Sequence, residues 1–172
     1  MRHIRYSVAM SLDGYIAGPN GENDWIIMDP DIDFNAFISQ YDTLLIGRGT
    51  YEPMVESGRV GMPGMKAYVI SSTLRQEDHP HVTIISENVN ERVAALRDQA
   101  GKDIWLFGGG ILFQSLLDAG LVDGVEVAII PVILGEGIPM LPSALNHAKL
   151  QLTSHRIFEK TGTVLLTYTV SG

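Results

Sequence analysis

The sequence predicts an α/β fold in which a mostly parallel central sheet carries an antiparallel hairpin at its C-terminal end. As far as residue 120, short apolar runs typical of strands alternate with stretches whose apolar residues recur at helical spacing. Parallel strands need a long return connection, and these helices supply it. Beyond residue 148 the pattern changes to two alternating runs joined by Glu159-Lys160-Thr161-Gly162, which predicts the hairpin.

Several segments have the length and composition of strands. In the last one Val164, Leu166, Tyr168 and Val170 share a face, because successive strand residues point to opposite sides of a sheet. The predicted strands lie near residues 3–10, 42–46, 66–71, 82–86, 103–107, 122–130, 149–158 and 163–170.

Helical patterns fill most of the gaps between these strands. The first predicted helix runs from about Pro30 to Gln40, with Asp29 as its N-cap and the proline at the first helical position. A second helix begins at Thr50. A third covers about residues 91–100 and buries Val93 and Leu96.

A fourth helix buries Leu112, Phe113, Leu116 and Leu117 and stops at Gly120. The third helix stops in the same way, at Gly101. Glycine ends helices well because it adopts positive φ without steric cost.

Length and composition favour one soluble domain. The chain has 172 residues, of which 45% are hydrophobic and 19% charged, so it can bury a sizeable core. It has no cysteine, which excludes disulfides, thiolate metal sites and a cysteine nucleophile, and suits a reducing, cytoplasmic location. The five histidines show no metal-ligand spacing, so we expect no bound metal.

The charge balance narrows the choice of partner. A net charge of −8 opposes binding to nucleic acid or to an anionic membrane. No apolar run is long enough to span a bilayer, and the N-terminal residues lack the apolar core of a signal peptide. We expect a small-molecule substrate as the partner.

Small and polar residues follow three of the predicted strands, at 47–50, 71–73 and 108–110. In an open parallel sheet these strand ends share one edge, where ligands bind, and helix N-termini there favour an anion. Any one turn could use glycine for its backbone conformation alone. Three turns on one edge predict a nucleotide site in which glycine lets a diphosphate approach the main chain.

The polar side chains near this edge favour NADP over NAD. No acidic residue stands where it would hold the adenosine ribose, whereas Ser71, Ser72 and Thr73 with Arg48 and Arg75 offer donors for a phosphate on that ribose. The sequence therefore predicts NADPH as the cofactor.

Asp33 is the carboxylate that the pattern singles out. Helical spacing puts it on the stripe of Phe37, near Tyr41, on a face expected to look inward, where burial would raise its pKa and allow proton relay. The alternative is that it only caps a helix start. Trp25, at the end of a polar loop, could likewise shield a reacting centre or simply pack.

These motifs resemble, in order and spacing, those of dihydrofolate reductase. The matching segments are Gly47-Arg48-Gly49-Thr50-Tyr51-Glu52, Pro63-Gly64 ahead of Val69-Ile70-Ser71-Ser72, and Phe107-Gly108-Gly109-Gly110. The segments 11–18 and 131–137 are more similar to the reductase domain of riboflavin biosynthesis, the RibD C-terminal domain, which shares the fold. The resemblance covers nearly the whole chain and implies a three-layer α/β/α domain over residues 1–172.

The resemblance also assigns roles to individual residues. On the substrate side it implies Asp33 as the carboxylate that binds the substrate, with Phe37 as the substrate-facing aromatic one turn later. We expect Asp33 to be the catalytic residue, and Trp25 to wall the pocket together with Phe37. On the cofactor side it implies that the diphosphate lies on the first and third turns, the adenosine phosphate near the second, and the nicotinamide beside the first strand. The implied cofactor residues are Val8, Ala9, Ile16, Gly47, Arg48, Gly49, Thr50, Ser71, Ser72, Thr73, Gly108, Gly109, Gly110, Ile111 and Leu112.

Two departures bear on the substrate. Met65 stands where dihydrofolate reductases carry the arginine that grips folate, and Tyr15 where the riboflavin-type reductases usually carry lysine. We expect an NADPH-dependent reductase that passes hydride to a C=N or C=O bond of a pterin-like or aminopyrimidine-like heterocycle. The alternatives are a true dihydrofolate reductase and a non-catalytic NADP-binding module. A homodimer is the expected assembly, partly because the resemblance to the riboflavin-type reductases implies it and partly because the hairpin offers an apolar margin that a partner could cover.

Overall fold

An eight-stranded sheet forms the centre of the computed structural model, which describes residues 1–143 and 146–172. The strand order across it is β5-β4-β3-β6-β1-β7-β10-β9, and β2 pairs with β8 in a separate ribbon. The strands are β1 (Ile4–Ser11), β2 (Tyr15–Ala17), β3 (Tyr41–Gly47), β4 (Lys66–Ile70), β5 (Thr83–Ile85), β6 (Asp103–Gly108), β7 (Gly124–Ile130), β8 (Ile138–Pro139), β9 (Lys149–Phe158) and β10 (Thr163–Ser171).

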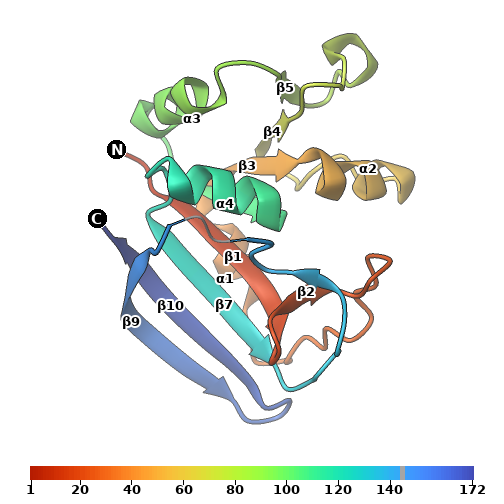
Figure 1. Ribbon diagram of the computed structural model, residues 1–172, viewed down its shortest axis with the longest axis vertical. Coiled ribbons are helices and arrows are strands. Elements are labelled where there is room, and N and C mark those ends of the chain that lie inside the picture. The colour runs from red at the N-terminus through yellow and green to blue at the C-terminus, as the bar shows by residue number, and fades with distance from the viewer. Residues whose placement is uncertain (144–145) are drawn as a thin grey trace.

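The pairing confirms a mostly parallel sheet with an antiparallel margin. Strands β5, β4, β3, β6, β1 and β7 are parallel neighbours, whereas β10 runs antiparallel to both β7 and β9. The predicted hairpin is therefore present, and it extends the sheet on the side away from β5 (Figure 1).

Helices cover both faces, which gives the predicted three layers. Figure 1 shows α3 (Val89–Asp98) and α4 (Gly110–Asp118) in front of the sheet and α1 (Phe34–Ile38) behind it. On the front face Phe113 of α4 stacks on Tyr6 of β1, with ring centroids 4.0 Å apart. On the other face Tyr51 of α2 (Arg48–Glu56) and Phe37 of α1 join the second apolar core.

The first helix differs from its prediction. It has five residues rather than the eleven from Pro30 to Gln40, and its N-cap is Asp33, whose side chain accepts a hydrogen bond from the backbone N–H of Ala36 at 2.9 Å. Asp29 is not a helix cap. Its carboxylate is fully buried and accepts the N–H of Asp31 instead, which holds the preceding residues in a turn.

Other boundaries move by a few residues. Helix α2 begins at Arg48, not Thr50, and α3 runs two residues ahead of its predicted start and end. The short strands β2 and β8 and the 3₁₀ turn at Gln76–Asp78 were not predicted, because two or three residues carry too little periodicity to read. None of the described helices combines the length and the apolar composition needed to cross a membrane.

Candidate active site

Three polar turns meet at one edge of the sheet, as the sequence predicts. They follow β4, β3 and β6, which are neighbours. A Cβ atom added at Gly47 would lie 3.4 Å from the carbonyl oxygen of Gly108 and 3.5 Å from the nitrogen of Gly109. Arg48 Nη1 donates to Thr73 Oγ1 at 2.9 Å, which joins the first turn to the second.

Two helices begin at this edge with their first N–H groups free of side-chain caps. The N-cap residues of α2 and α4 are Gly47 and Gly109, and neither helix has a side-chain cap hydrogen bond. Gly49, in the first turn of α2, has nothing within 4 Å of the position of a Cβ atom. Free N–H groups, two helix dipoles and open space beside the main chain fit a diphosphate.

The polar side chains of the edge divide into two groups. Ser71 is buried, and its Oγ accepts the backbone N–H groups of Thr73 and Leu74, so it shapes the turn. Ser72 and Thr73 are exposed, and Arg48 is half-exposed, so these three can reach a ligand phosphate. Arg75 forms an exposed ion pair with Glu77.

The start of α4 is closely packed, so its glycines do not leave open space for a ligand beside Gly110. A Cβ atom at Gly110 would lie 2.6 Å from the carbonyl oxygen of Met140, so a strand connection fills that space. Leu112 is buried in the core, whereas Ile111 is 79% exposed. Gly110 and Leu112 can therefore meet a ligand only through their backbone, and Ile111 through its side chain.

The residues predicted to flank the nicotinamide are half-buried. Val8 and Ala9 lie on β1, where Val8 packs against the front core and Ala9 faces the opposite side. Ile16 lies on β2. The neighbouring turn is held by Asp13, which accepts Ser11 Oγ at 2.7 Å and the N–H groups of Leu134 and Gly135, and these bonds lower the pKa of Asp13, the Ser11 bond most.

Asp33 is exposed, so the expectation that its carboxylate is buried is wrong. The reason is that α1 begins at Phe34, so Asp33 lies ahead of the helix as its N-cap and not on the inward face of a longer helix. Phe37 does face inward. Its ring makes edge contact with Trp105 at 4.9 Å and lies 5.2 Å from Tyr41.

Trp25 is half-buried in the segment between β2 and α1, and its Nε1 donates to the carbonyl of Glu22 at 3.0 Å. The far end of this segment is tied to the hairpin turn. Asp29 accepts the N–H of Thr161 at 3.0 Å and its hydroxyl at 2.8 Å, and Lys160 pairs with Asp31 at 2.7 Å. Burial opposes ionisation of Asp29, but its hydrogen bonds outweigh that effect and lower its pKa.

Sequence reasoning missed a carboxylate on the α1 side of the sheet. Glu126, on β7, is half-buried and accepts Ser7 Oγ at 2.9 Å and Thr167 Oγ1 at 3.3 Å. Trp105 Nε1 donates to the carbonyl of Ser7 at 3.2 Å, so this group adjoins the aromatic residues around Phe37. The available signal was one acidic residue within an otherwise apolar strand.

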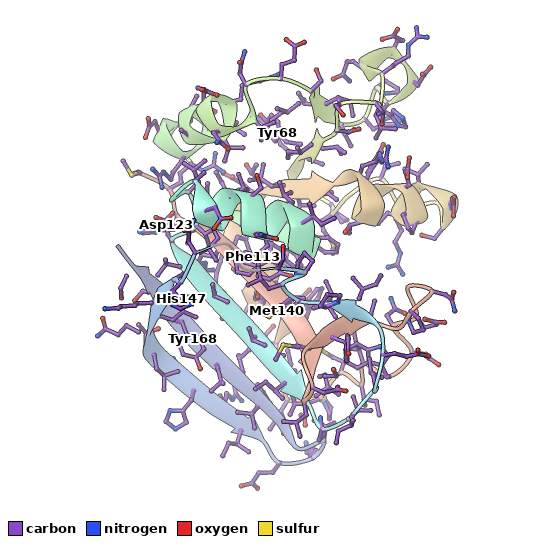
Figure 2. All side chains as sticks on the ribbon, viewed as in Figure 1. Tyr68, Phe113, Asp123, Met140, His147 and Tyr168 are labelled. Atoms are coloured by element: carbon purple, nitrogen blue, oxygen red, sulfur yellow. The ribbon has the colours of Figure 1, made fainter. Side chains whose placement is uncertain are left out.

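The surface has two hollows, and Figure 2 labels Tyr68 at one of them and Phe113, Met140 and His147 at the other. One, of about 360 Å³, lies between α3 and the strands β4 and β5 and is lined by Tyr68 and Arg92. The other, of about 310 Å³, is lined by Phe113, Met140 and His147. Neither is lined by a residue of the predicted site.

Comparison with known proteins identifies relatives over nearly the whole chain. The Bacillus subtilis protein YyaP is 38% identical over 99% of this chain and 96% of its own length. The riboflavin biosynthesis protein RibD of Corynebacterium ammoniagenes is 25% identical over 84% of this chain, which spans only 48% of that longer protein.

Solved structures share the fold. A protein of Shewanella sp. PV-4 superposes with a TM-score of 0.82 at 25% identity, over the full length of both chains. Dihydrofolate reductase from Enterococcus faecalis superposes with a TM-score of 0.72 at 21% identity, over 99% of this chain and 97% of the enzyme. The fold is therefore that of dihydrofolate reductase.

The family model of the RibD C-terminal domain matches residues 2–164. This match supports a reductase-type function, and it agrees with the geometry of the edge, where glycine turns and helix N-termini meet. The chain belongs to the RibD C-terminal domain family.

Proposed function

We propose that this protein is an NADPH-dependent reductase of a small heterocycle, with a pterin-like or aminopyrimidine-like ring as its substrate. The observation that carries the proposal is the meeting of the turns 47–50 and 108–110 at the N-termini of α2 and α4. Main-chain donors at that edge would hold the diphosphate of the cofactor. Bound NADPH would supply a hydride to a C=N or C=O bond of the substrate.

The choice of NADPH over NADH rests on the second turn. Arg48 and Thr73 lie within hydrogen-bond distance of one another, and Ser72 beside them is exposed. A guanidinium and two hydroxyl groups suit a phosphate on the adenosine ribose, which NADH lacks. The Enterococcus faecalis enzyme of the same fold was solved with NADP(H).

On the substrate side, this chain supplies an aromatic wall and a carboxylate. Phe37 is half-buried, with its ring packed on the buried Trp105, and it offers a flat apolar surface for a planar ring. Asp33, at the start of α1, would hold or deliver a proton at the substrate, while the hydrogen bond that its side chain accepts from the N–H of Ala36 keeps it in place. Trp25, on the segment preceding α1, would exclude water from the reacting bond.

On the substrate side, this chain differs from dihydrofolate reductases at a residue that binds folate, which argues against folate as its substrate. Met65, at the position of the folate-gripping arginine, packs against the second apolar core rather than offering a charge. The named activity of the Corynebacterium relative, riboflavin biosynthesis, makes aminopyrimidine precursors the first compounds to assay.

Titration calorimetry with each reduced coenzyme tests the cofactor. We expect NADPH to bind at least about tenfold more tightly than NADH, and Arg48→Ala to remove most of this difference. Arg59→Ala, an exposed arginine beyond α2, is the matched control and should leave both affinities unchanged. No heat with either coenzyme would overturn the proposal.

A spectrophotometric assay at 340 nm tests the reaction. We expect oxidation of NADPH with at least one compound among dihydropterins, aminopyrimidines and flavin precursors, and none with dihydrofolate. Tight NADPH binding without oxidation of any of them would instead identify a binding module. Turnover of dihydrofolate would identify a dihydrofolate reductase.

A further inference from the structure

A row of polar side chains crosses the back face of the sheet, on which α1 lies (Figure 1). The register pairs Ser7 of β1 with Glu126 of β7, and Glu126 with Thr167 of β10. All three residues are half-buried. Their neighbours Val125 and Val127 on β7 point the other way and belong to the front core. Glu126 therefore places a carboxylate on the back face, with part of its surface open to water.

Two hydroxyl groups fix the orientation of the Glu126 carboxylate. Ser7 Oγ donates to its Oε1 at 2.9 Å, and Thr167 Oγ1 donates to its Oε2 at 3.3 Å. An ionised carboxylate has about four acceptor positions on its two oxygens, so each oxygen can accept a further bond. Two parallel N–H donors of a ligand can fill these positions, in the paired arrangement that makes hydrogen bonds to a carboxylate strong.

Within the described part of the chain, Glu126 forms no ion pair. Arg5, which lies on the same face of β1, pairs with Asp103 at 3.4 Å instead. Aromatic rings lie beside the carboxylate: Trp105, whose ring contacts Phe37 at 4.9 Å, donates to the main chain of β1 next to this row. A partly desolvated charge without a counter-charge is stabilised by a ligand that brings N–H donors.

The next row along the back face suits a flat ring. Ala9 of β1 pairs with Ala128 of β7, which pairs with Leu165 of β10. The two alanines are half-buried and carry only a methyl group, so a ring can lie close to the sheet over them. Ala9 follows Ser7 by two residues, about 7 Å along the strand. Because Ala9 is also one of the residues expected to flank the nicotinamide, one ring system can reach both Glu126 and the hydride donor.

We propose that Glu126 binds the substrate by accepting two N–H groups from one edge of its ring. Such an edge needs an amino group next to a protonated ring nitrogen, as in a 2-aminopyrimidin-4-one or a pterin. A ring that lacks the amino group loses one of the two bonds. This inference rests on the proposed function and narrows its substrate class to 2-amino heterocycles. Glu126 selects the ring, and Asp33 keeps its proposed role in proton transfer.

Titration calorimetry with two small pyrimidines tests the inference. The probes are 2-aminopyrimidin-4-one and pyrimidin-4-one, which differ only in the amino group, and NADP⁺ is present because it has no hydride to give. We expect wild type to bind the first probe at least about tenfold more tightly than the second. Glu126→Gln should remove this preference, because an amide offers only one acceptor oxygen. Glu91→Gln, an exposed glutamate of α3, is the matched control and should keep it.

A second pair of variants tests the hydroxyl that orients Glu126. Thr167→Val keeps the shape of the side chain and removes its hydroxyl, so it should reduce the preference for the amino compound about threefold. Thr169→Val, two residues along the same face of β10, removes an exposed hydroxyl and should leave the preference unchanged. Equal weakening of both probes by Thr167→Val would show that Thr167 has only a structural role.

The outcomes separate this inference from the proposed function. Suppose that wild type binds NADPH but does not bind the amino compound, does not prefer it, or keeps its preference in Glu126→Gln. Any of these results would overturn the role of Glu126 and leave the proposed reductase standing. A preference for the amino compound in a protein that binds neither reduced coenzyme would instead overturn the proposed function and retain Glu126 as a ligand-binding residue.

Discussion

Asp33 combines a structural and a proposed chemical role in one carboxylate. Its Oδ1 accepts the N–H of Ala36, and the side chain is otherwise exposed beside Phe37, one turn later. Asparagine caps helices as well as aspartate does, so Asp33→Asn removes the charge and keeps the cap. We expect that variant to bind NADPH within a few-fold of wild type and to turn over at least about tenfold more slowly.

Calorimetry and steady-state kinetics on the same preparation check this prediction. Asp31→Asn removes a carboxylate two residues away whose partner is Lys160, and it should leave turnover unchanged. If Asp33→Asn turned over at the wild-type rate, Asp33 would have no part in the chemistry.

Tyr6 carries a buried hydroxyl with no hydrogen-bond partner among the described residues. Burial raises its pKa, so the group stays neutral. No hydrogen bond from the described residues compensates the free-energy cost of removing the hydroxyl from water. We expect Tyr6→Phe to raise the free energy of unfolding by about 1 kcal/mol, because the ring keeps its stacking on Phe113. Urea unfolding at pH 7 measures it, and a loss of stability would show that the hydroxyl has a partner.

The glycine turns position the candidate site, and each glycine serves a different purpose. Gly47 lets the turn after β3 approach the turn after β6, and Gly110 lets the connection through Met140 cross the start of α4. Gly108 has φ of +134°, which other residues rarely adopt. Gly49 alone faces open space.

Because Gly110 lies against backbone and Gly49 faces open space, substitutions at these two glycines test folding and ligand binding separately. Gly110→Ala should lower the free energy of unfolding by about 2 kcal/mol, because its methyl group would meet a backbone oxygen. Gly49→Ala should hold or slightly raise stability, since alanine favours the helix, yet weaken NADPH binding by filling the space beside the main chain. Thermal unfolding and calorimetry of both variants check this, and unchanged NADPH affinity in Gly49→Ala would remove that turn from the cofactor site.

The sequence predicted the strands and the glycine turns well, and α1 poorly. Strand periodicity and turn chemistry depend on adjacent residues, so a short stretch of sequence is enough to recognise them. The pattern from Pro30 to Gln40 looked helical throughout, but Asp29 and Asp31 are held by the hairpin turn, and only five residues form the helix. A contact between segments that distant cannot be seen in a local pattern.

Three aspartates make the stability of the whole molecule sensitive to acid. The pKa values of Asp13, Asp29 and Asp42 are all lowered; at Asp42 desolvation acts against the shift, and the N–H of Lys102, the Thr43 hydroxyl and Arg2 outweigh it. Below the ordinary carboxyl pKa of about 4 the unfolded chain therefore binds more protons than the folded one. Stability should be nearly constant from pH 7 to 5 and fall as the pH drops below about 4.

Urea unfolding across this range measures the effect. In Asp42→Asn, which removes one of the three groups, the fall between pH 5 and 3 should be smaller than in wild type. Asp118→Asn, on the exposed side of α4, serves as the control. An equal fall in Asp42→Asn would show that Asp42 does not contribute to the acid response.

Residue order alone was enough to establish the class of fold, the edge where the turns meet and the family resemblance, because periodicity, turn residues and motif spacing are properties of neighbours along the chain. Folding in three dimensions was needed to expose Asp33, to bury Asp29 against Thr161, to pair Glu126 with Ser7, and to leave the hairpin uncovered. Asp29 and Thr161 are 132 positions apart, and Ser7 and Glu126 are 119 apart. Burial and charge pairing over such separations depend on how whole elements pack, which no local pattern records.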